Sequence, residues 1–528
     1  MPIIVMNVKT PLDVSEAEIV SSALREIGVG RRHVLSASVY KTSLDARKRE
    51  RTREGIRLVS SILLSLDSEN LERDLSKRQN VKYFEELTLN PVISGKKSDG
   101  RVVIAGFGPA GMFAALILSE YGYKPIVLER GGSVDERVEK ISGYWSGGEL
   151  DESTNIQFGE GGAGTFSDGK LTTRINDPLC RYVLEKFVEF GAPESILRIA
   201  KPHLGTDNLC GIVKNIRERI IENGGEVRFH SELTGITFDG ERIVKVSTPS
   251  GDIETSTLIL AIGHSAHDTF EMLLDSGIRL EPKPFSVGAR IEHTQDSVDK
   301  SLYGDFAGSP LLPKGEYQLS HRRRDGRACY TFCMCPGGLV VASASKKGTI
   351  VTNGMSMYRR DSENANSAVV VSVTPDDFGH NALDGVRFAS DIEKKAYLLS
   401  GDSRAPSMTV GDFLGKPTSR TVIPSYKPGV AERDLNNLFP QFVTDMMKEG
   451  LAKFATQMDC FGNMGAVLTA PETRTSSPVR IPRDENMRAM GTENLIPCGE
   501  GPGYAGGIMS AAVDGIRAAL EVMKCFAP

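Results

Sequence analysis

The sequence predicts an α/β protein with three parts: a small α+β domain, a larger domain with a parallel sheet, and a β-rich domain inserted into the larger one. The 528 residues are too many for one hydrophobic core. A strand, a glycine-rich turn, a helix and a second strand follow one another over residues 101–130. Strand-like sequence with Gly-containing turns fills 285–380, and a glycine-rich turn with a helix returns near the end of the chain.

Composition narrows the class of protein. The chain is 40% hydrophobic and 25% charged, and its net charge of −5 gives no general reason to expect a nucleic acid or an anionic membrane as partner. The start, MPIIVMNVKT, lacks a secretory pattern, and no apolar run approaches the about 20 residues of a membrane helix. The eight scattered cysteines suggest reduced thiols. We therefore expect a cytoplasmic protein with no membrane partner.

Residues 1–95 predict a small α+β domain of the ferredoxin-like type, joined by a linker to residue 100. Ser15 and Glu18 have the spacing of a capping box at the start of a helix. The stretch RKRERTREGIR is locally basic and is most simply a solvated hairpin. The alternative is that Arg47, Lys48 and Arg49 bind RNA or another partner. Binding of a nucleic acid through this domain is therefore the less favoured of two expectations.

The glycine-rich turn after residue 105 has the context of a dinucleotide-binding site. The apolar strand RVVIA leads into Gly106-x-Gly108-x-x-Gly111, and a helix that opens with Pro109 and Ala110 leads out. Gly106 allows the tight turn, Gly108 lets the backbone approach a diphosphate, and Gly111 lets helix and strand pack closely. The diphosphate is expected at the helix N-terminus, where free N–H groups and the helix dipole favour an anion.

The strand KPIVLE, which follows that helix, ends in Glu129. This carboxylate is expected to accept hydrogen bonds from both hydroxyls of a ribose and to repel a 2′-phosphate, and Arg130 follows it at the same edge.

A second match to the glycine pattern, Gly159-x-Gly161-x-x-Gly164, has no strand before it and no helix after it. We interpret it as a loop around the ligand rather than a second dinucleotide turn.

Two later stretches indicate which dinucleotide is bound. TLILAIG is a strand ending in Gly263, and LIPCGEGPGYAGGI precedes an apolar helix. In these stretches the chain resembles the glutathione-reductase-like FAD flavoproteins. The resemblance implies that Gly499 and Glu500 contact the ribityl chain, although Glu500 stands where that family usually has Asp. It also implies that the helix opening at 505–508 directs its positive end toward the flavin.

Over nearly its full length the chain resembles the uncharacterised FAD-dependent dehydrogenases of bacteria. The matching stretches are FGEGGAGTFSDGKL, FSVGARIEH, FCMCPGG, TNGMS and ETRTSSPVRI. The resemblance implies a Rossmann-type FAD-binding domain over 100–284 and 460–528, with an inserted antiparallel-β substrate domain over 285–459. The FAD-binding residues expected on these grounds are Gly106, Gly108, Pro109, Ala110, Gly111, Glu129, Arg130, Lys170, Leu233, Gly263, Gly499, Glu500, Ala505, Gly506, Gly507 and Ile508.

Four side chains are expected to carry chemistry near the flavin. Lys170 is expected beside the flavin or an anionic substrate, with an ordinary surface lysine as the alternative. Arg474 could form a carboxylate clamp, and a structural ion pair is equally consistent with its position. Cys333 and Cys335 complete the set. His203 and His293 could donate protons, but a hydrogen-bonded structural role is the more common one.

The cysteines of FCMCPGG allow four interpretations. A zinc site would need about four ligands, and no second Cys/His pair supplies them, so no metal is expected. The disulfide reductases of the resembling class place their cysteine pair just after the first βαβ unit, and residues 131–150 contain none. A strand-to-loop bend with packed thiols is favoured, and a thiol that lines the substrate pocket remains the alternative.

The sequence therefore predicts an FAD-dependent oxidoreductase that transfers a hydride between the flavin and an unidentified small molecule. Only one complete strand–turn–helix unit is present, so NADH or NADPH would bind only transiently. Two alternatives stay open: an RNA-associated flavoprotein of the tRNA-modifying type, and a non-catalytic flavin-binding protein.

Overall fold

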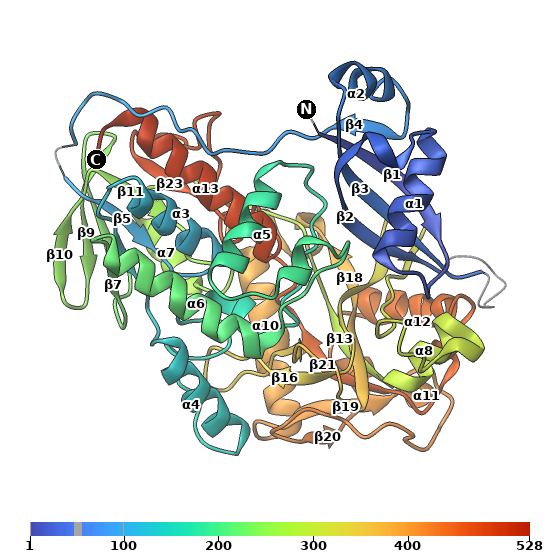
Figure 1. Ribbon diagram of the computed structural model, residues 1–528. Helices are drawn as coiled ribbons and strands as arrows, with labels where there is room; N and C mark the ends of the chain where they lie inside the picture. The colour runs from blue at the N-terminus through green and yellow to red at the C-terminus, as the bar shows by residue number, and fades with distance from the viewer. Residues whose placement is uncertain (1, 47–54, 99) are drawn as a thin grey trace.

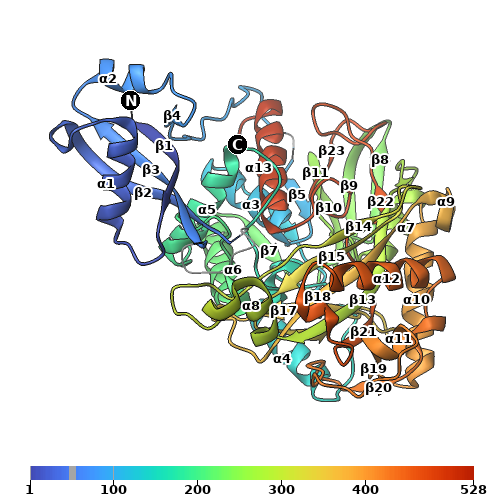
Figure 2. The ribbon, with the colours of Figure 1, turned by 90° about the vertical axis from the view of Figure 1, so that its right-hand side faces the viewer.

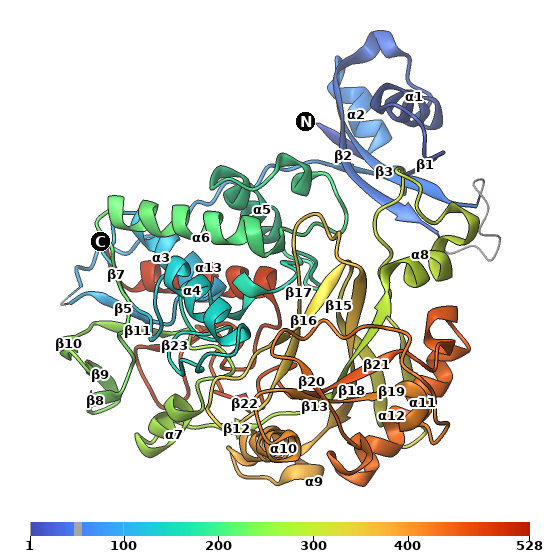
Figure 3. The same ribbon diagram turned by 90° about the horizontal axis from the view of Figure 1, so that it is seen from below.

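The computed structural model describes residues 2–46, 55–98 and 100–528. A small N-terminal unit, blue in Figure 1, stands to one side of two larger bodies, and the view from below in Figure 3 shows the same separation. The basic residues Arg47, Lys48 and Arg49, on which the RNA interpretation depends, lie outside the described residues.

The N-terminal domain has the predicted ferredoxin-like fold. Its antiparallel sheet has the order β2-β3-β1-β4, and the Ser15–Glu18 capping box is present at the start of its first helix. The elements are β1 (Ile3–Thr10), α1 (Glu16–Ile27), η1 (Arg31–His33), β2 (Val34–Asp45), β3 (Arg57–Leu66), α2 (Glu69–Leu75) and β4 (Val81–Tyr83). The backbone of Thr42 in β2 pairs with the chain at Arg198 and Ala200, which joins this domain to the loop before Lys201.

The second body is built on a five-stranded parallel sheet of order β23-β11-β5-β6-β7, which is the predicted α/β arrangement. The strands are β5 (Val102–Ala105), β6 (Ile126–Leu128), β7 (Glu226–Arg228), β11 (Thr257–Leu260) and β23 (Leu495–Pro497). Successive strand residues point to opposite faces, so Val102 and Ile104 belong to one apolar cluster while Val103 and Ala105 belong to another.

Helices cover one face of this sheet, and a small antiparallel sheet with one helix covers the other. The first set consists of α3 (Pro109–Glu120), α5 (Leu179–Glu189), α6 (Gly205–Glu222) and α13 (Ile508–Cys525). The second consists of β8 (Gly235–Asp239), β9 (Arg242–Thr248), β10 (Gly251–Glu254) and α7 (His267–Asp275). α3 and α13 lie side by side in Figure 1, and the Cβ of an alanine at Gly515 would lie 2.0 Å from the Ala110 carbonyl oxygen. Only glycine permits this close crossing.

The third body contains a seven-stranded sheet of order β14-β15-β18-β13-β21-β19-β20, antiparallel except for the pair β19–β20. Its strands are β13 (Phe285–Thr294), β14 (Ser320–Arg322), β15 (Ala328–Cys335), β18 (Asn364–Val373), β19 (Ala405–Thr409), β20 (Val430–Glu432) and β21 (Val467–Glu472). A separate two-stranded ribbon pairs β16 (Gly338–Ala342) with β17 (Thr352–Ser356). The long strands β13 and β18 run antiparallel over ten paired residues, which makes them the centre of this body.

Five helices pack around the seven-stranded sheet in the described chain, and Val386 of one of them also joins the core of the parallel-sheet body. The helices are α8 (Gln295–Tyr303), α9 (Pro375–Phe378), α10 (Asp384–Ser400), α11 (Val410–Phe413) and α12 (Gln441–Ala455). Figure 2 shows α12 across β13, β15 and β18, and it begins directly after Pro440, which caps it rather than interrupting it. Val287, Ala289 and Ile291 of β13 face the helices, so Arg290 points to the opposite side.

The predicted end of the inserted domain at residue 459 is too early. β21 was expected in the FAD-binding domain, but it pairs with β13 and β19 inside the seven-stranded sheet. The two chain crossings between the bodies lie together, because β12 (Glu281–Pro282) pairs with β22 (Val479–Arg480). No local pattern marks this boundary, because a short buried strand such as VLTAPE fits either sheet.

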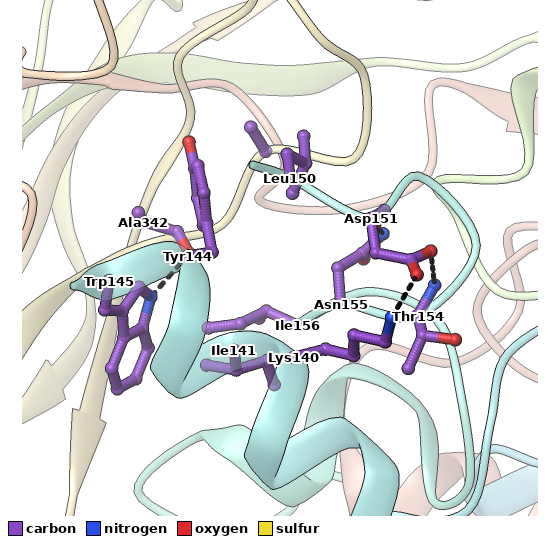
Figure 4. Close-up of a pocket in the computed structure, with 11 residues that line it drawn as sticks. Lys140, Ile141, Tyr144, Trp145, Leu150, Asp151, Thr154, Asn155, Ile156 and Ala342 are labelled. Carbon is purple, nitrogen blue, oxygen red and sulfur yellow. Dashed lines mark hydrogen bonds and ion pairs between the residues drawn. The ribbon is translucent and has the colours of Figure 1, made fainter. Parts of the chain in front are cut away.

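α4 (Val134–Trp145) fastens the segment that follows it to the ribbon. The Trp145 indole Nε1 donates a hydrogen bond to the Ala342 carbonyl oxygen at 3.3 Å, and Lys140 pairs with Asp151 at 3.4 Å (Figure 4). The niche between these side chains has a volume of about 10 Å³. That is about the smallest space that holds one water molecule, so this is an anchoring contact and not a ligand site.

Candidate functional site

A large cavity lies between the parallel sheet and the seven-stranded sheet. Its volume is about 1440 Å³, which exceeds the usual range of roughly 300–1,000 Å³ for a small-molecule site. It opens at the carboxyl ends of the parallel strands, where ligands bind in open α/β sheets. The space is therefore large enough for a long cofactor together with a second molecule.

The first glycine turn forms one end of this cavity. Gly106 has a φ of +99°, and a Cβ there would lie 2.3 Å from the Ala261 carbonyl oxygen. A Cβ at Gly111 would lie 2.0 Å from the Gly106 carbonyl oxygen. α3 begins after Gly108 without a side-chain cap, so its first N–H groups remain available to a ligand in the cavity.

The second glycine pattern packs against the first, as a loop and not as a second Rossmann turn. The Gly161 N–H donates to the Phe107 carbonyl oxygen at 2.8 Å, and a Cβ at Gly162 would lie 3.0 Å from the Gly108 Cα. The chain then forms the short 3-10 helix η2 (Gly162–Phe166). The buried Arg137 of α4 holds this loop by donating to the Glu160 and Asn155 carbonyl oxygens. Nothing in the sequence distinguished Arg137 from a surface arginine.

Glu129 lines the cavity and also supports both glycine loops. Its carboxylate accepts hydrogen bonds from the backbone N–H groups of Phe107, Gly131 and Gly159, each at 2.9 Å. A carboxylate has about four acceptor sites, so about one remains for a ribose hydroxyl. The expected contact of Glu129 with a ribose therefore stays a prediction.

Arg130 and Leu233 line the cavity beyond Glu129. The Arg130 guanidinium pairs with Asp268 at 2.9 Å and lies 4.4 Å from the centre of the Phe158 ring. These contacts hold the arginine side chain in place at the cavity wall.

The C-terminal glycine-rich segment forms the opposite wall. Gly499 has a φ of +83°, and its N–H donates to Asp514 at 2.8 Å, while Arg483 binds the same carboxylate with two hydrogen bonds. Gly263 meets this segment closely, because a Cβ at Gly501 would lie 2.5 Å from the Gly263 carbonyl oxygen. The resemblance implied that the segments at Gly263 and Gly499 approach the same cofactor, and in the structure these segments lie against each other.

Glu500 faces the cavity beside this turn. Burial raises the pKa of its carboxyl to about 7, against the opposing positive charge of Lys283. α13 begins nearby after Gly507, and its start has no side-chain cap. The cavity lining includes residues 505–508, so the N-termini of α3 and α13 both reach the same space.

Lys170 is part of a buried ion-pair cluster and is not a surface lysine. Its Nζ lies 2.7 Å from Asp168 and 3.5 Å from Glu316, and Arg360 binds the other side of Asp168. Burial opposes the charged form, but the two carboxylates outweigh it and raise the pKa of Lys170. Lys170 lines the cavity as a cation held between the two carboxylates.

Arg474 has the structural role that the sequence analysis left open. It donates to both carboxylate oxygens of Glu393 at 3.1 and 3.0 Å and to the Ser345 hydroxyl at 2.6 Å. It lines the cavity with three of its donors already used. The alternative of a free carboxylate clamp is therefore not supported.

The two histidines are structural. His203 hydrogen-bonds the Tyr358 carbonyl oxygen at 2.9 Å and stacks on the Tyr358 ring. His293 is fully buried between Tyr317 and Phe461, and burial lowers its pKa to about 3. Neither lines the cavity.

The two cysteines of FCMCPGG differ in their surroundings. Cys333 lines the cavity, whereas Cys335 is fully buried behind it. Cys333 therefore fits the interpretation of a residue that lines the pocket, and Cys335 fits that of a packed thiol.

In the described part of the chain, no group of three or more His, Cys, Asp or Glu side chains is arranged to hold a metal. None of the described helices is long and apolar enough to cross a membrane.

Comparison with known proteins identifies the family. Residues 284–475 match the model of the FAD-dependent protein, C-terminal domain-like family. An uncharacterized protein of Clostridium beijerinckii is 41% identical over 533 residues, covering 100% of this chain and 99% of that protein. The chain belongs to this family of FAD-dependent proteins. The matched range ends at residue 475, after β21, which agrees with the sheet boundary in the structure.

Two solved enzyme structures are distantly similar to this chain. Glycine oxidase from Bacillus cereus is 11% identical, with 81% of this chain and 98% of that chain covered and a TM-score of 0.33. L-proline dehydrogenase from P. horikoshii is 11% identical, with 82% and 95% covered and a TM-score of 0.34. At this level of similarity they carry no inference about the chemistry of this chain.

Proposed function

We propose that this chain binds one FAD in the cavity and is an oxidoreductase that passes a hydride between the flavin and a small molecule. The observation that carries the proposal is the meeting of two uncapped helix N-termini, from α3 and α13, in one cavity bounded by the Gly106–Gly111 turn. Two such ends favour a ligand with negative charge at two separated places, which an FAD diphosphate and a reduced flavin supply.

The cavity residues divide by position along such a cofactor. The glycine turn with Pro109 and Ala110 would hold the diphosphate, and Glu129, Arg130 and Leu233 the adenosine end. Gly263, Gly499 and Glu500 would contact the ribityl chain, with 505–508 beside the flavin. Bound FAD supplies the hydride chemistry. The chain holds it, excludes water with the seven-stranded sheet, and stabilises negative charge with the end of α13.

The sheet side of the cavity would receive the substrate. Lys170 is a fixed cation there and would orient a carboxylate or another anionic group. Arg474 supports the wall through Glu393 and is a positioning residue in this proposal. NADH or NADPH would have to enter the same space, because the structure has one strand–glycine turn–helix unit of this type within the described residues.

Anaerobic reduction tests the oxidoreductase proposal. The purified protein is mixed in separate experiments with NADH, NADPH and a panel of amino and hydroxy acids, and the visible flavin bands are followed. Bleaching by one donor at a rate well above that of free FAD is expected. Bound flavin that no donor reduces would support the non-catalytic alternative.

Binding of RNA is not proposed, because neither the comparisons nor the described residues support it.

The Glu500 carboxyl gives a pH dependence that can be measured. Its pKa of about 7 in the folded chain lies above the ordinary 4.5, so between these values the folded state holds a proton that the unfolded state has lost. The stabilisation that comes from this raised pKa is complete below pH 4.5 and disappears as pH rises through 7. Without FAD, the wild type should therefore lose about 1–3 kcal/mol across this range relative to Glu500→Gln. Urea unfolding at several pH values measures it, and parallel curves for the two proteins would contradict it.

A further inference from the structure

We propose that Cys333 and Cys335 form a dithiol–disulfide pair that exchanges two electrons with the flavin, as a second redox centre on the sheet side of the cavity. The inference rests on the proposed binding of FAD. Its basis is the geometry of the FCMCPGG segment, which places one thiol in the cavity and a second thiol directly behind it.

Cys333 is held in an uncommon backbone conformation. Its φ is +43°, in the left-handed region that residues other than glycine seldom adopt. The pairing of β15 with β18 shifts register between Phe332 and Cys335, which is the mark of a bulge. Bulges next to sites often redirect a side chain. The Arg290 Nη1 fixes this conformation by donating to the Cys333 carbonyl oxygen at 2.8 Å.

Two cations stabilise a thiolate at Cys333. The buried Arg290 reaches its carbonyl oxygen, and Lys170 lines the same cavity. A hydrogen bond from the Cys335 thiol and the charges of Arg290 and Lys170 together lower the pKa of the Cys333 thiol, against burial and the Glu472 carboxylate. The lowered pKa favours the thiolate, which is the reactive form of cysteine.

Cys335 is positioned to react with an oxidised Cys333 sulfur and form the disulfide. Its Sγ lies 3.4 Å from the Cys333 carbonyl oxygen, and it is fully buried. The hydrogen bond to Cys333 and burial raise its pKa, so it keeps its proton. The space around it is tight, since a Cβ at Gly354 would lie 2.8 Å from this sulfur. The pair consists of a half-buried cysteine at the cavity wall and a fully buried cysteine two residues further on, an arrangement suited to thiol–disulfide exchange.

The exchange balances in atoms and electrons. The Cys333 thiolate and the Cys335 thiol form one S–S bond, lose two electrons and release the Cys335 proton. Bound FAD would supply the two-electron acceptor, so that the two electrons, the proton released by Cys335 and the negative charge lost from Cys333 would all pass to the flavin. The reverse direction reduces the disulfide. The other six cysteines do not line the cavity and cannot replace this pair.

Reductive titration of the oxidised FAD-loaded protein counts the redox centres. Wild type is expected to take up four electrons per FAD from dithionite, two for the flavin and two for the disulfide. Cys335→Ser and Cys333→Ser should each take up two. Cys210→Ser is the matched control and should take up four, because Cys210 is half-buried and lies outside the cavity.

Thiol chemistry gives a second readout that does not need FAD. At pH 7 iodoacetamide should alkylate Cys333 at least about tenfold faster than Cys210, whose pKa burial raises to about 11. Mild oxidation should remove two hydrogen atoms from the peptide that carries Cys333 and Cys335, and Cys335→Ala should abolish this change while keeping the folded circular dichroism of the wild type.

Wild type that takes up two electrons per FAD and keeps both thiols open to alkylation after oxidation would overturn the inference. A chain that forms the disulfide but binds no FAD would overturn both the electron exchange and the proposed function. A chain that binds and reduces FAD with both thiols inert would overturn the inference alone.

Discussion

Gly111→Ala is expected to remove most FAD binding. The added Cβ would lie 2.0 Å from the Gly106 carbonyl oxygen and 3.0 Å from its carbon, so either the turn or the helix α3 must move. The first N–H groups of α3 then leave their present positions, where they would meet the diphosphate. A strained contact of this kind costs about 1–3 kcal/mol, which is about 5–150-fold in the Kd for FAD. Titration of flavin-free protein with FAD, followed by flavin fluorescence, measures it.

Gly211→Ala is the matched control for this substitution. Gly211 lies in α6, and its Cβ would have no atom within 4 Å. Alanine is the better helix former, so this variant should keep its FAD affinity and gain about 0.5–1 kcal/mol of stability. Equal FAD affinity for Gly111→Ala and wild type would show that the diphosphate does not bind at this turn.

Arg290→Met is expected to destabilise the seven-stranded sheet by about 3–5 kcal/mol, because it leaves a buried carboxylate without its partner. Arg290 is fully buried and donates to both oxygens of Glu472, each at 2.9 Å. It also donates to Asn353, Asn366 and the Cys333 carbonyl oxygen. Urea unfolding should show the loss, and alkylation of Cys333 at neutral pH should become slower.

Two further variants separate this effect from general fragility. Arg290→Met with Glu472→Leu removes both charges and should recover part of the lost stability. Arg404→Met breaks an exposed pair with Asp402 and should leave stability unchanged. An Arg290→Met protein as stable as the wild type would contradict the role given to this pair.

Local patterns in the sequence predicted most of the fold. The ferredoxin-like domain, the capping box at Ser15 and the helix α3 after the glycine turn all depend on residues close together in the chain. The sequence also predicted why Gly106 and Gly111 are glycines. A Cβ at Gly106 would meet the backbone that follows the next parallel strand, and a Cβ at Gly111 would meet the backbone of the same motif.

The contacts that shape the site could not be read from such patterns. Asp168 meets Arg360 across 192 positions, and Arg290 meets Glu472 across 182. A single sequence does not state which distant charges pair, so Arg474 remained undecided between a clamp and an ion pair. Glu129 was assigned to the ribose, yet the backbone groups it supports include a loop 30 residues away. The boundary at β21 failed for the same reason, since strand pairing is a long-range property.

The most direct test of the account is the FAD content of the purified chain. Wild type, released from any bound flavin and reconstituted, should bind one FAD per chain and show structured flavin bands, while Gly111→Ala should bind it far more weakly. A folded wild-type chain that takes up no FAD would contradict the assignment of the cavity between the two sheets.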